Sequence, residues 1–108
     1  MGAAHEYGTF LDVLLPVKSK GKSGAPKSKH EYSRSVPASL RPLRGRERFQ
    51  AAQLEATISH RIFVEYAPDI TARCQFRETG TDRVFHPFSV IDIDERHAEM
   101  EILASEVV

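Results

Sequence analysis

Residues 45–66 read GRERFQAAQLEATISHRIFVEY, and within this run the spacing of the apolar side chains changes from helical to extended. Residues 45–56 are mostly strong helix formers, with apolar side chains at helical spacing. These apolar side chains are Phe49, Ala52 and Ala56. In residues 58–66 apolar and polar side chains alternate, as they do in a half-buried strand. We therefore expect a helix over 45–56 that leads directly into a strand.

Working outward from this run, five more segments have the composition of strands, and most are separated by turn sequences. They are residues 9–17, 31–43, 70–77, 83–93 and 99–104. Residues 18–30 are different, because they hold five lysines and a single apolar residue, Ala25. Such a segment buries too little surface to offset its ordering entropy, so we expect a long flexible basic loop. The sequence predicts a mainly β fold: a small antiparallel barrel of about six strands, one α-helix, and a single domain over residues 1–108.

The charges are balanced overall but unevenly distributed. The chain has 15 basic and 15 acidic residues, yet residues 18–48 hold ten basic residues and only two acidic ones. Residues 49–108 hold eleven acidic and five basic residues. Copies of the chain could therefore meet basic side to acidic side, a head-to-tail contact that closes into a ring when the rotation allows. Contact between the basic loop and DNA phosphates is the alternative.

Motifs for nucleotide or metal binding are incomplete. The triplet at 21–23, Gly-Lys-Ser, ends a P-loop, but Pro16 stands where its first glycine belongs and no helix is expected after it. Residues 92–95 include three carboxylates, but His97 stands where an EF-hand needs glycine, so we expect a solvated turn. No two histidines have the three-to-five residue spacing of common zinc sites. We expect no cofactor and no metal.

Catalysis is not expected either. His60 is in register with Ile58 and Ile62, which favours a core or interface histidine with a hydrogen-bond partner over a ligand or base. Cys74, the single cysteine, lies in an apolar phase and reads as a small core residue. No nucleophile can be paired with His60, so we assign no catalytic residue. The chain has no secretory h-region and no apolar run long enough for a membrane span, so a soluble protein without a membrane partner is expected.

Several motifs in this order resemble the head-tail joining proteins of tailed phages, also called head closure, stopper or head-tail adaptor proteins. They are Pro42-Leu43, Gly45-Arg46-Glu47, Thr57 with His60, and Val90-Ile91-Asp92. The resemblance covers about residues 8–106. It implies a small β-barrel with one helix that forms a ring, commonly a dodecamer. It also implies a virion structural protein, located in the neck and assembled in the host cytoplasm, in a phage, a prophage or a gene-transfer agent.

The resemblance further implies partners: copies of the chain itself, a portal or adaptor protein above, and a tail or tail-terminator protein below. On this basis we expect four arginines near a subunit or adaptor interface: Arg41, Arg44, Arg46 and Arg48. We expect five lysines to line or approach a DNA channel: Lys18, Lys20, Lys22, Lys27 and Lys29. The sequence leaves open whether these lysines contact packaged DNA or only keep a loop solvated. A free-standing, non-specific nucleic-acid-binding β-barrel is the alternative function.

Overall fold

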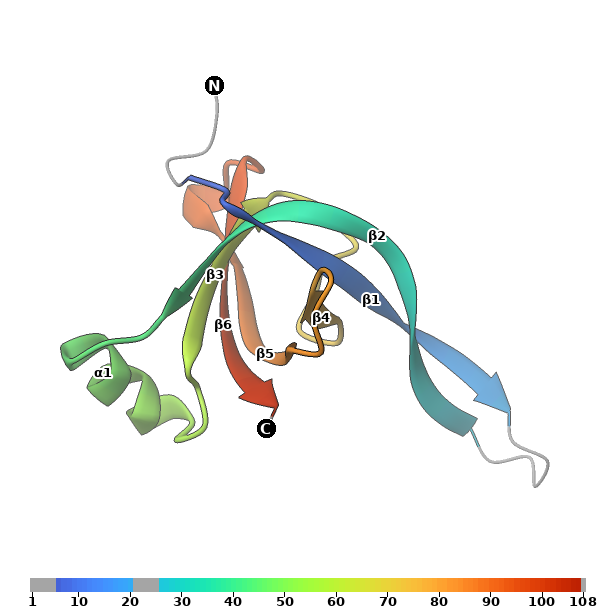
Figure 1. Cartoon of the computed structure of the whole chain (residues 1–108), viewed down its shortest axis with the longest axis horizontal. Helices are drawn as coiled ribbons and strands as arrows, with labels where there is room; N and C mark the ends of the chain where they lie inside the picture. Colours follow the sequence, from blue (N-terminus) through green and yellow to red (C-terminus); the bar gives the residue numbers. More distant parts are fainter. Residues whose placement is uncertain (1–5, 21–25, 108) are drawn as a thin grey trace.

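The protein folds as a closed antiparallel barrel (Figure 1). The structure is a computed structural model that describes residues 6–20 and 26–107. Within these residues the elements are β1 (Thr9–Lys20), β2 (Pro26–Pro42), α1 (Arg46–Leu54), β3 (His60–Glu65), β4 (Gln75–Glu78), β5 (Val84–Asp92), the 3-10 turn η1 (Ile93–Glu95) and β6 (Glu99–Val107). The strands follow the order β1-β2-β3-β6-β5-β4, and pairing of β4 with β1 closes the barrel. The predicted mainly β barrel with one helix is confirmed.

The core fills the barrel with side chains from every strand. Its largest fully buried members include Phe76 from β4, Phe85 from β5 and Ile102 from β6. The alternation expected over residues 58–66 holds for Ile62 and Val64, which belong to this core, and for the exposed Glu65, whereas Phe63 in the opposite phase is also buried. Cys74 is buried in the same cluster, as its apolar phase predicts. Alternate residues of each strand therefore face the core, and their apolar side chains are kept away from water.

The long β1–β2 hairpin corrects the expected boundaries of the basic loop. Backbone pairing continues without a gap to Lys20 opposite Pro26, so residues 18–20 and 26–30 are strand. Residues 21–25 lie outside the described part of the chain. Once β1 and β2 are paired in the barrel, each further pair adds backbone hydrogen bonds at little extra loop cost, and an apolar face is not required. Composition alone therefore gave the wrong secondary structure for this segment.

Strand β4 is shorter than the 70–77 segment predicted for it. Residues 67–74 form turns, and Ile70 and Cys74 are buried from those turns rather than from a strand. The segment packs over the side of β2, where Asp69 accepts two hydrogen bonds from Arg34 at 2.8 and 3.0 Å. Among the described residues, no helix has the length and apolar character needed to span a membrane.

Candidate assembly surfaces

Three parts of the molecule extend from the barrel, and the first is the β1–β2 arm, which we define as residues 15–20 and 26–36. β1 pairs with β4 only over Leu11–Leu14, and β2 pairs with β3 only from Ala38 onward, so the arm is two-stranded. Figure 1 shows it projecting to the right, on the side opposite α1. His30 Nε2 lies 2.8 Å from the Arg73 carbonyl and anchors the base of the arm. Arg34 of the arm also contacts Asp69, through two hydrogen bonds.

The predicted DNA-contacting lysines all belong to this arm or its tip. Lys18, Lys20 and Lys27 are placed on its strands by their backbone, and their side chains lie outside what the structure describes. Lys29 is exposed, with Nζ 3.7 Å from Glu31 Oε1. Lys22 lies outside the described residues. These five are all the lysines of the chain, and the four whose backbone is described lie on this arm.

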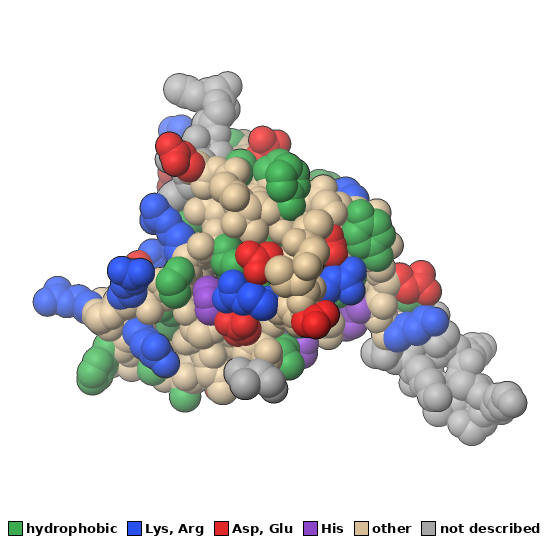
Figure 2. Space-filling view, in the orientation of Figure 1, with side chains coloured by type: hydrophobic (Ala, Val, Ile, Leu, Met, Phe, Trp, Pro, Cys, Tyr) green, Lys and Arg blue, Asp and Glu red, His purple; other side chains and the backbone are tan. Residues whose placement is uncertain are grey.

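The second surface, the α1 end, carries the four predicted interface arginines. Arg41 ends β2, Arg44 lies in the connection, and Arg46 and Arg48 lie in the first turn of α1. All four are exposed, and none forms an ion pair with a described residue. Figure 2 shows the blue side chains gathered over this end, on the left. The 18–48 segment therefore divides its positive charge between two opposite ends of the molecule rather than forming one basic side.

α1 packs on the barrel by a different face from the one its sequence suggests. Ala51 is buried against Leu43, Ile58 and Leu103, whereas Phe49 is 76% exposed. The expected stripe of Phe49, Ala52 and Ala56 is therefore wrong, since all three are exposed. Gly45 opens the helix at a positive φ of 53°, a region that glycine enters without steric cost. That entry angle turns the small side chain of Ala51 inward and leaves the larger apolar side chains outside.

A salt bridge chain fixes α1 to the sheet. Arg61 of β3 donates through Nη1 to Glu47 of α1, and its Nε lies 2.7 Å from Glu101 Oε2 of β6. This pairing removes Glu47 and Arg61 from the free charge of the surface. This salt bridge lines a cleft of about 280 Å³, together with Arg41, Pro42, Leu43 and Arg44. A second hollow of about 470 Å³ lies along the helix against Gly45, Arg48, Phe49, Ala52 and Gln53. The α1 end therefore combines unpaired cationic groups with exposed apolar surface.

The third surface, the turn end, is formed by residues 92–99 with Glu65. Residues 92–99 contain four acidic side chains and one arginine. Asp94 and Glu95 are exposed, and Asp92 accepts a hydrogen bond from the His97 backbone at 3.0 Å. No group of three or more potential metal ligands occurs among the described residues. As the sequence indicates, this region is a solvated turn.

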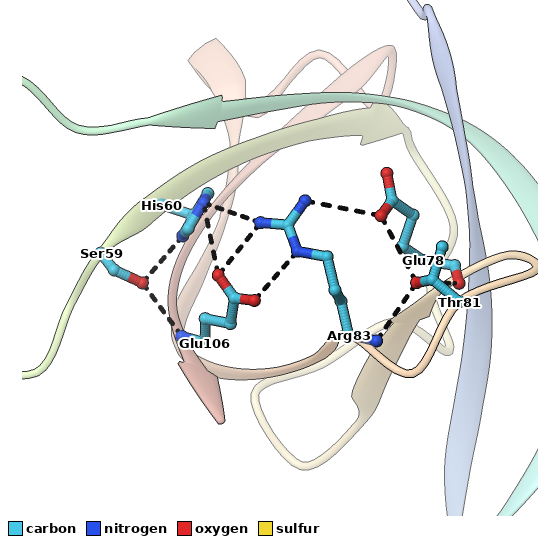
Figure 3. Close-up of polar contacts among 6 residues, drawn as sticks. All are labelled: Ser59, His60, Glu78, Thr81, Arg83 and Glu106. Atoms are coloured by element: carbon cyan, nitrogen blue, oxygen red, sulfur yellow. Dashed lines mark hydrogen bonds and ion pairs between the residues drawn. The ribbon is translucent and has the colours of Figure 1, made fainter. Parts of the chain in front are cut away.

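Buried and half-buried polar groups form two networks, and the first surrounds His60 (Figure 3). Arg83 of β5's leading turn makes a double contact with Glu106 of β6, at 2.9 and 3.0 Å. Its Nη2 lies 3.4 Å from His60 Nε2, and His60 Nδ1 lies 2.8 Å from Ser59 Oγ. Arginine can only donate, so Nε2 accepts and Nδ1–H donates to the serine oxygen. Ser59 Oγ also accepts the Glu106 N–H at 3.0 Å, which leaves it stabilised as an acceptor rather than activated as a nucleophile.

The charges in this network are tuned by burial and pairing. Burial lowers the pKa of His60, and the nearby Arg83 acts in the same direction while Glu106 opposes it. The hydrogen bond from Arg83 lowers the pKa of Glu106. His60 is thus a buried neutral histidine with partners, as its register with Ile58 and Ile62 predicts. The network joins β3, β5 and β6 and has the character of a structural cluster.

The second network surrounds Asp12 of β1 and was not anticipated from the sequence. Its carboxylate accepts hydrogen bonds from Ser35 at 2.7 Å, Thr79 at 2.7 Å and Arg77 at 3.0 Å. Burial alone would raise the pKa of Asp12, but these three donors outweigh burial and lower it. The signal that could have found the site is an aspartate inside an apolar run, which requires partners if its strand is buried.

The structure combines a closed barrel, two polar networks, and charged projections on opposite sides. The model of the phage head completion protein family matches residues 7–107, almost the whole chain. The chain belongs to the phage head completion protein family. It is therefore a virion structural protein that acts with other phage structural proteins at the head, as the resemblance noted in its sequence implies.

Solved structures share the fold of this head completion protein at low sequence identity. The solution structure of protein SF1141 from Shigella flexneri 2a is 18% identical, with a TM-score of 0.78 over 95% of each chain. A chain from the virion of a native gene transfer agent particle is 19% identical, with a TM-score of 0.62, over 92% of this chain and 94% of that one. No curated protein sequence matches the chain. The overall fold is thus shared at low sequence identity.

Proposed function

We propose that this head completion protein is a ring-forming head-tail connector. It closes the DNA-filled head below the portal and its adaptor and gives the tail its docking surface. Family membership supports a place at the completed head. The observation that carries the finer proposal is the shape: the arm and the α1 end project from opposite sides of one closed barrel (Figure 1). A subunit of this shape can contact a neighbour or adaptor through one side while the other reaches a central channel.

The two projections differ in chemistry, and this supports different partners. The α1 end has arginines beside exposed Phe49 and Leu54, and arginine and aromatic side chains are enriched at protein interfaces. The arm carries only lysine among its cations close to the tip, and lysine neutralises phosphates as a point charge without reading sequence. We therefore assign the α1 end to protein contacts and the arm to the packaged DNA.

The test is to mix the purified protein with DNA-filled, tail-less heads that bear portal and adaptor. Cryo-electron microscopy of the vertex and a nuclease assay of the DNA then report binding and closure. The proposal predicts a ring below the adaptor and DNA that stays protected. Heads without the adaptor, as a control, should recruit no ring. Absence of vertex binding together with tight, salt-sensitive binding of the monomer to free DNA would overturn the connector and favour a nucleic-acid-binding barrel.

A further inference from the structure

The α1 end is a surface whose charge and apolar side chains define the kind of partner that could bind it. Its unpaired cationic side chains are Arg41, Arg44, Arg46 and Arg48. Apolar surface lies at the same end, because Phe49 is 76% and Leu54 62% exposed, and Arg48 lines one hollow with Phe49. Exposed apolar side chains with charged side chains nearby are the pattern of an interface core with its rim. A matching partner must present carboxylates around an apolar group.

The turn end of the same chain meets this demand. Glu65, Asp94 and Glu95 are exposed and make no ion pair with described residues, so their charge is available. Ile91, the last apolar residue of β5 before the turn, is 49% exposed beside them. Figure 1 shows the turn end above the barrel and α1 below it to the left. A chain therefore cannot satisfy its own α1 end, but a second copy can.

We propose that the α1 end of one copy docks on the turn end of the next. This inference rests on the proposed function and names the two faces of the contact. Because the faces differ, the contact is heterologous and propagates in one direction around a closed ring. It leaves the arm free on every copy. Contacts between opposite charges at a rim fix the register and the partner, while the apolar centre excludes water.

Charge reversal tests the pairing directly. The helix variant carries Arg44→Glu, Arg46→Glu and Arg48→Glu, and the turn variant carries Glu65→Lys, Asp94→Lys and Glu95→Lys. All six side chains are exposed and lack ion pairs with described residues, so the barrel should fold. Glutamates in the first turn of α1 also interact favourably with the helix dipole. Each variant alone brings like charges together at every contact, and we expect about tenfold or greater loss of ring formation at the vertex.

An equimolar mixture of the two variants is the decisive sample. An acidic α1 end then meets a basic turn end, and a basic α1 end meets an acidic turn end, so alternating rings should form and restore vertex binding. A single chain that carries all six substitutions should restore vertex binding as well. Matched controls are Arg73→Glu and Asp82→Lys, which reverse exposed charges elsewhere on the barrel and should assemble normally.

The outcomes separate this inference from the proposed function. If the wild-type protein forms no ring at the vertex, the connector proposal itself fails. If wild-type rings form and both variants also form them, the pairing of α1 end with turn end is wrong while the connector stands. If only the helix variant fails and the mixture does not rescue it, α1 contacts the adaptor instead, and the inference is again overturned.

Discussion

Single buried residues carry charge that the fold must stabilise, and Asp12 is the clearest example. This residue is only 6% exposed, and its carboxylate holds together β1, β2, β4 and the turn after β4 through Ser35, Arg77 and Thr79. Asp12→Ala leaves these donors without an acceptor, and we expect about 3 kcal/mol lower free energy of unfolding. Urea denaturation measures the loss. Asp82→Ala, in an exposed turn, is the control and should change stability by less than about 0.5 kcal/mol.

The depressed pKa of Asp12 also fixes a direction for acid sensitivity. Below the ordinary carboxyl pKa of about 3.9, Asp12 is protonated in the unfolded chain but still ionised in the folded protein. The free energy of unfolding therefore decreases as the pH is lowered through this range. Asp69 and Glu106, whose pKa values are lowered by Arg34 and Arg83, contribute in the same direction. Acid unfolding is therefore carried by paired carboxylates.

His60 makes a separate prediction at higher pH. Because burial lowers its pKa, the unfolded chain binds the proton first as the pH falls below about 6.5. The contribution of neutral His60 to the free energy of unfolding is full well above that pH, and it is lost as the pH falls through about 6.5 toward 5. His60→Gln should flatten this part of the curve, measured by urea unfolding at successive pH values. His86→Gln, at an exposed position of β5, is the matched control. Equal slopes for wild type and His60→Gln would exclude this account.

Among the elements, the arm separates assembly from DNA contact. Val17 lies opposite Lys29, so replacing residues 18–28 with Asn-Gly creates a two-residue hairpin in the same register. The core strands are unaffected, and we expect the free energy of unfolding to change by less than about 1 kcal/mol. Vertex binding should persist while DNA leaks from the closed heads, as measured by nuclease sensitivity.

A second variant separates the length of the arm from its charge. Replacing Lys18, Lys20, Lys22, Lys27 and Lys29 with serine keeps the chain length and removes the cations. If these lysines contact DNA, this variant loses retention with a weaker dependence on salt. Full retention in both variants across a range of salt would show that the arm does not contact DNA.

Some features of the helices and strands could be predicted from the sequence and others could not. The strand after α1 was predictable because Ile58, His60, Ile62 and Val64 share one phase of an alternation that only Phe63 breaks. The buried face of α1 was not, because Gly45 sets the entry angle and the barrel then selects Ala51 over the larger Phe49. The strand residues of the arm at 18–20 and 26–30 were expected to be loop, because their pairing continues that of the barrel strands and their sequence has no apolar alternation. The four arginines were assigned to an interface from the resemblance, and that assignment stays a prediction; their lack of ion pairs with described residues is visible only in the fold.

At the scale of the whole molecule, the sequence predicted a barrel but not the order of its strands, because strand order depends on non-local pairs. β1 meets β4 across more than sixty residues, with Asp12 opposite Arg77. Sequence periodicity reports which face of a strand is buried, not which strand lies beside it. The same non-local order places α1 and the turn end at separate positions on one barrel, which gives each copy two different faces.

The barrel should not be uniformly stable, and β4 is its weakest strand. It spans Gln75–Glu78 and pairs with β5 at only two positions, whereas β3 and β6 pair over six. Local opening should therefore begin along β4, with the amides of β3 and β6 protected up to the global free energy. Native-state hydrogen exchange measures this order, and amides of Gln75–Glu78 should exchange faster than those of Ile62–Val64. In assembled rings the α1 and turn-end amides should gain protection while β4 does not, since β4 lies outside the proposed contact. Protection gained at β4 but not at α1 would place the neighbour on the wrong side of the barrel and refute the head-to-tail arrangement.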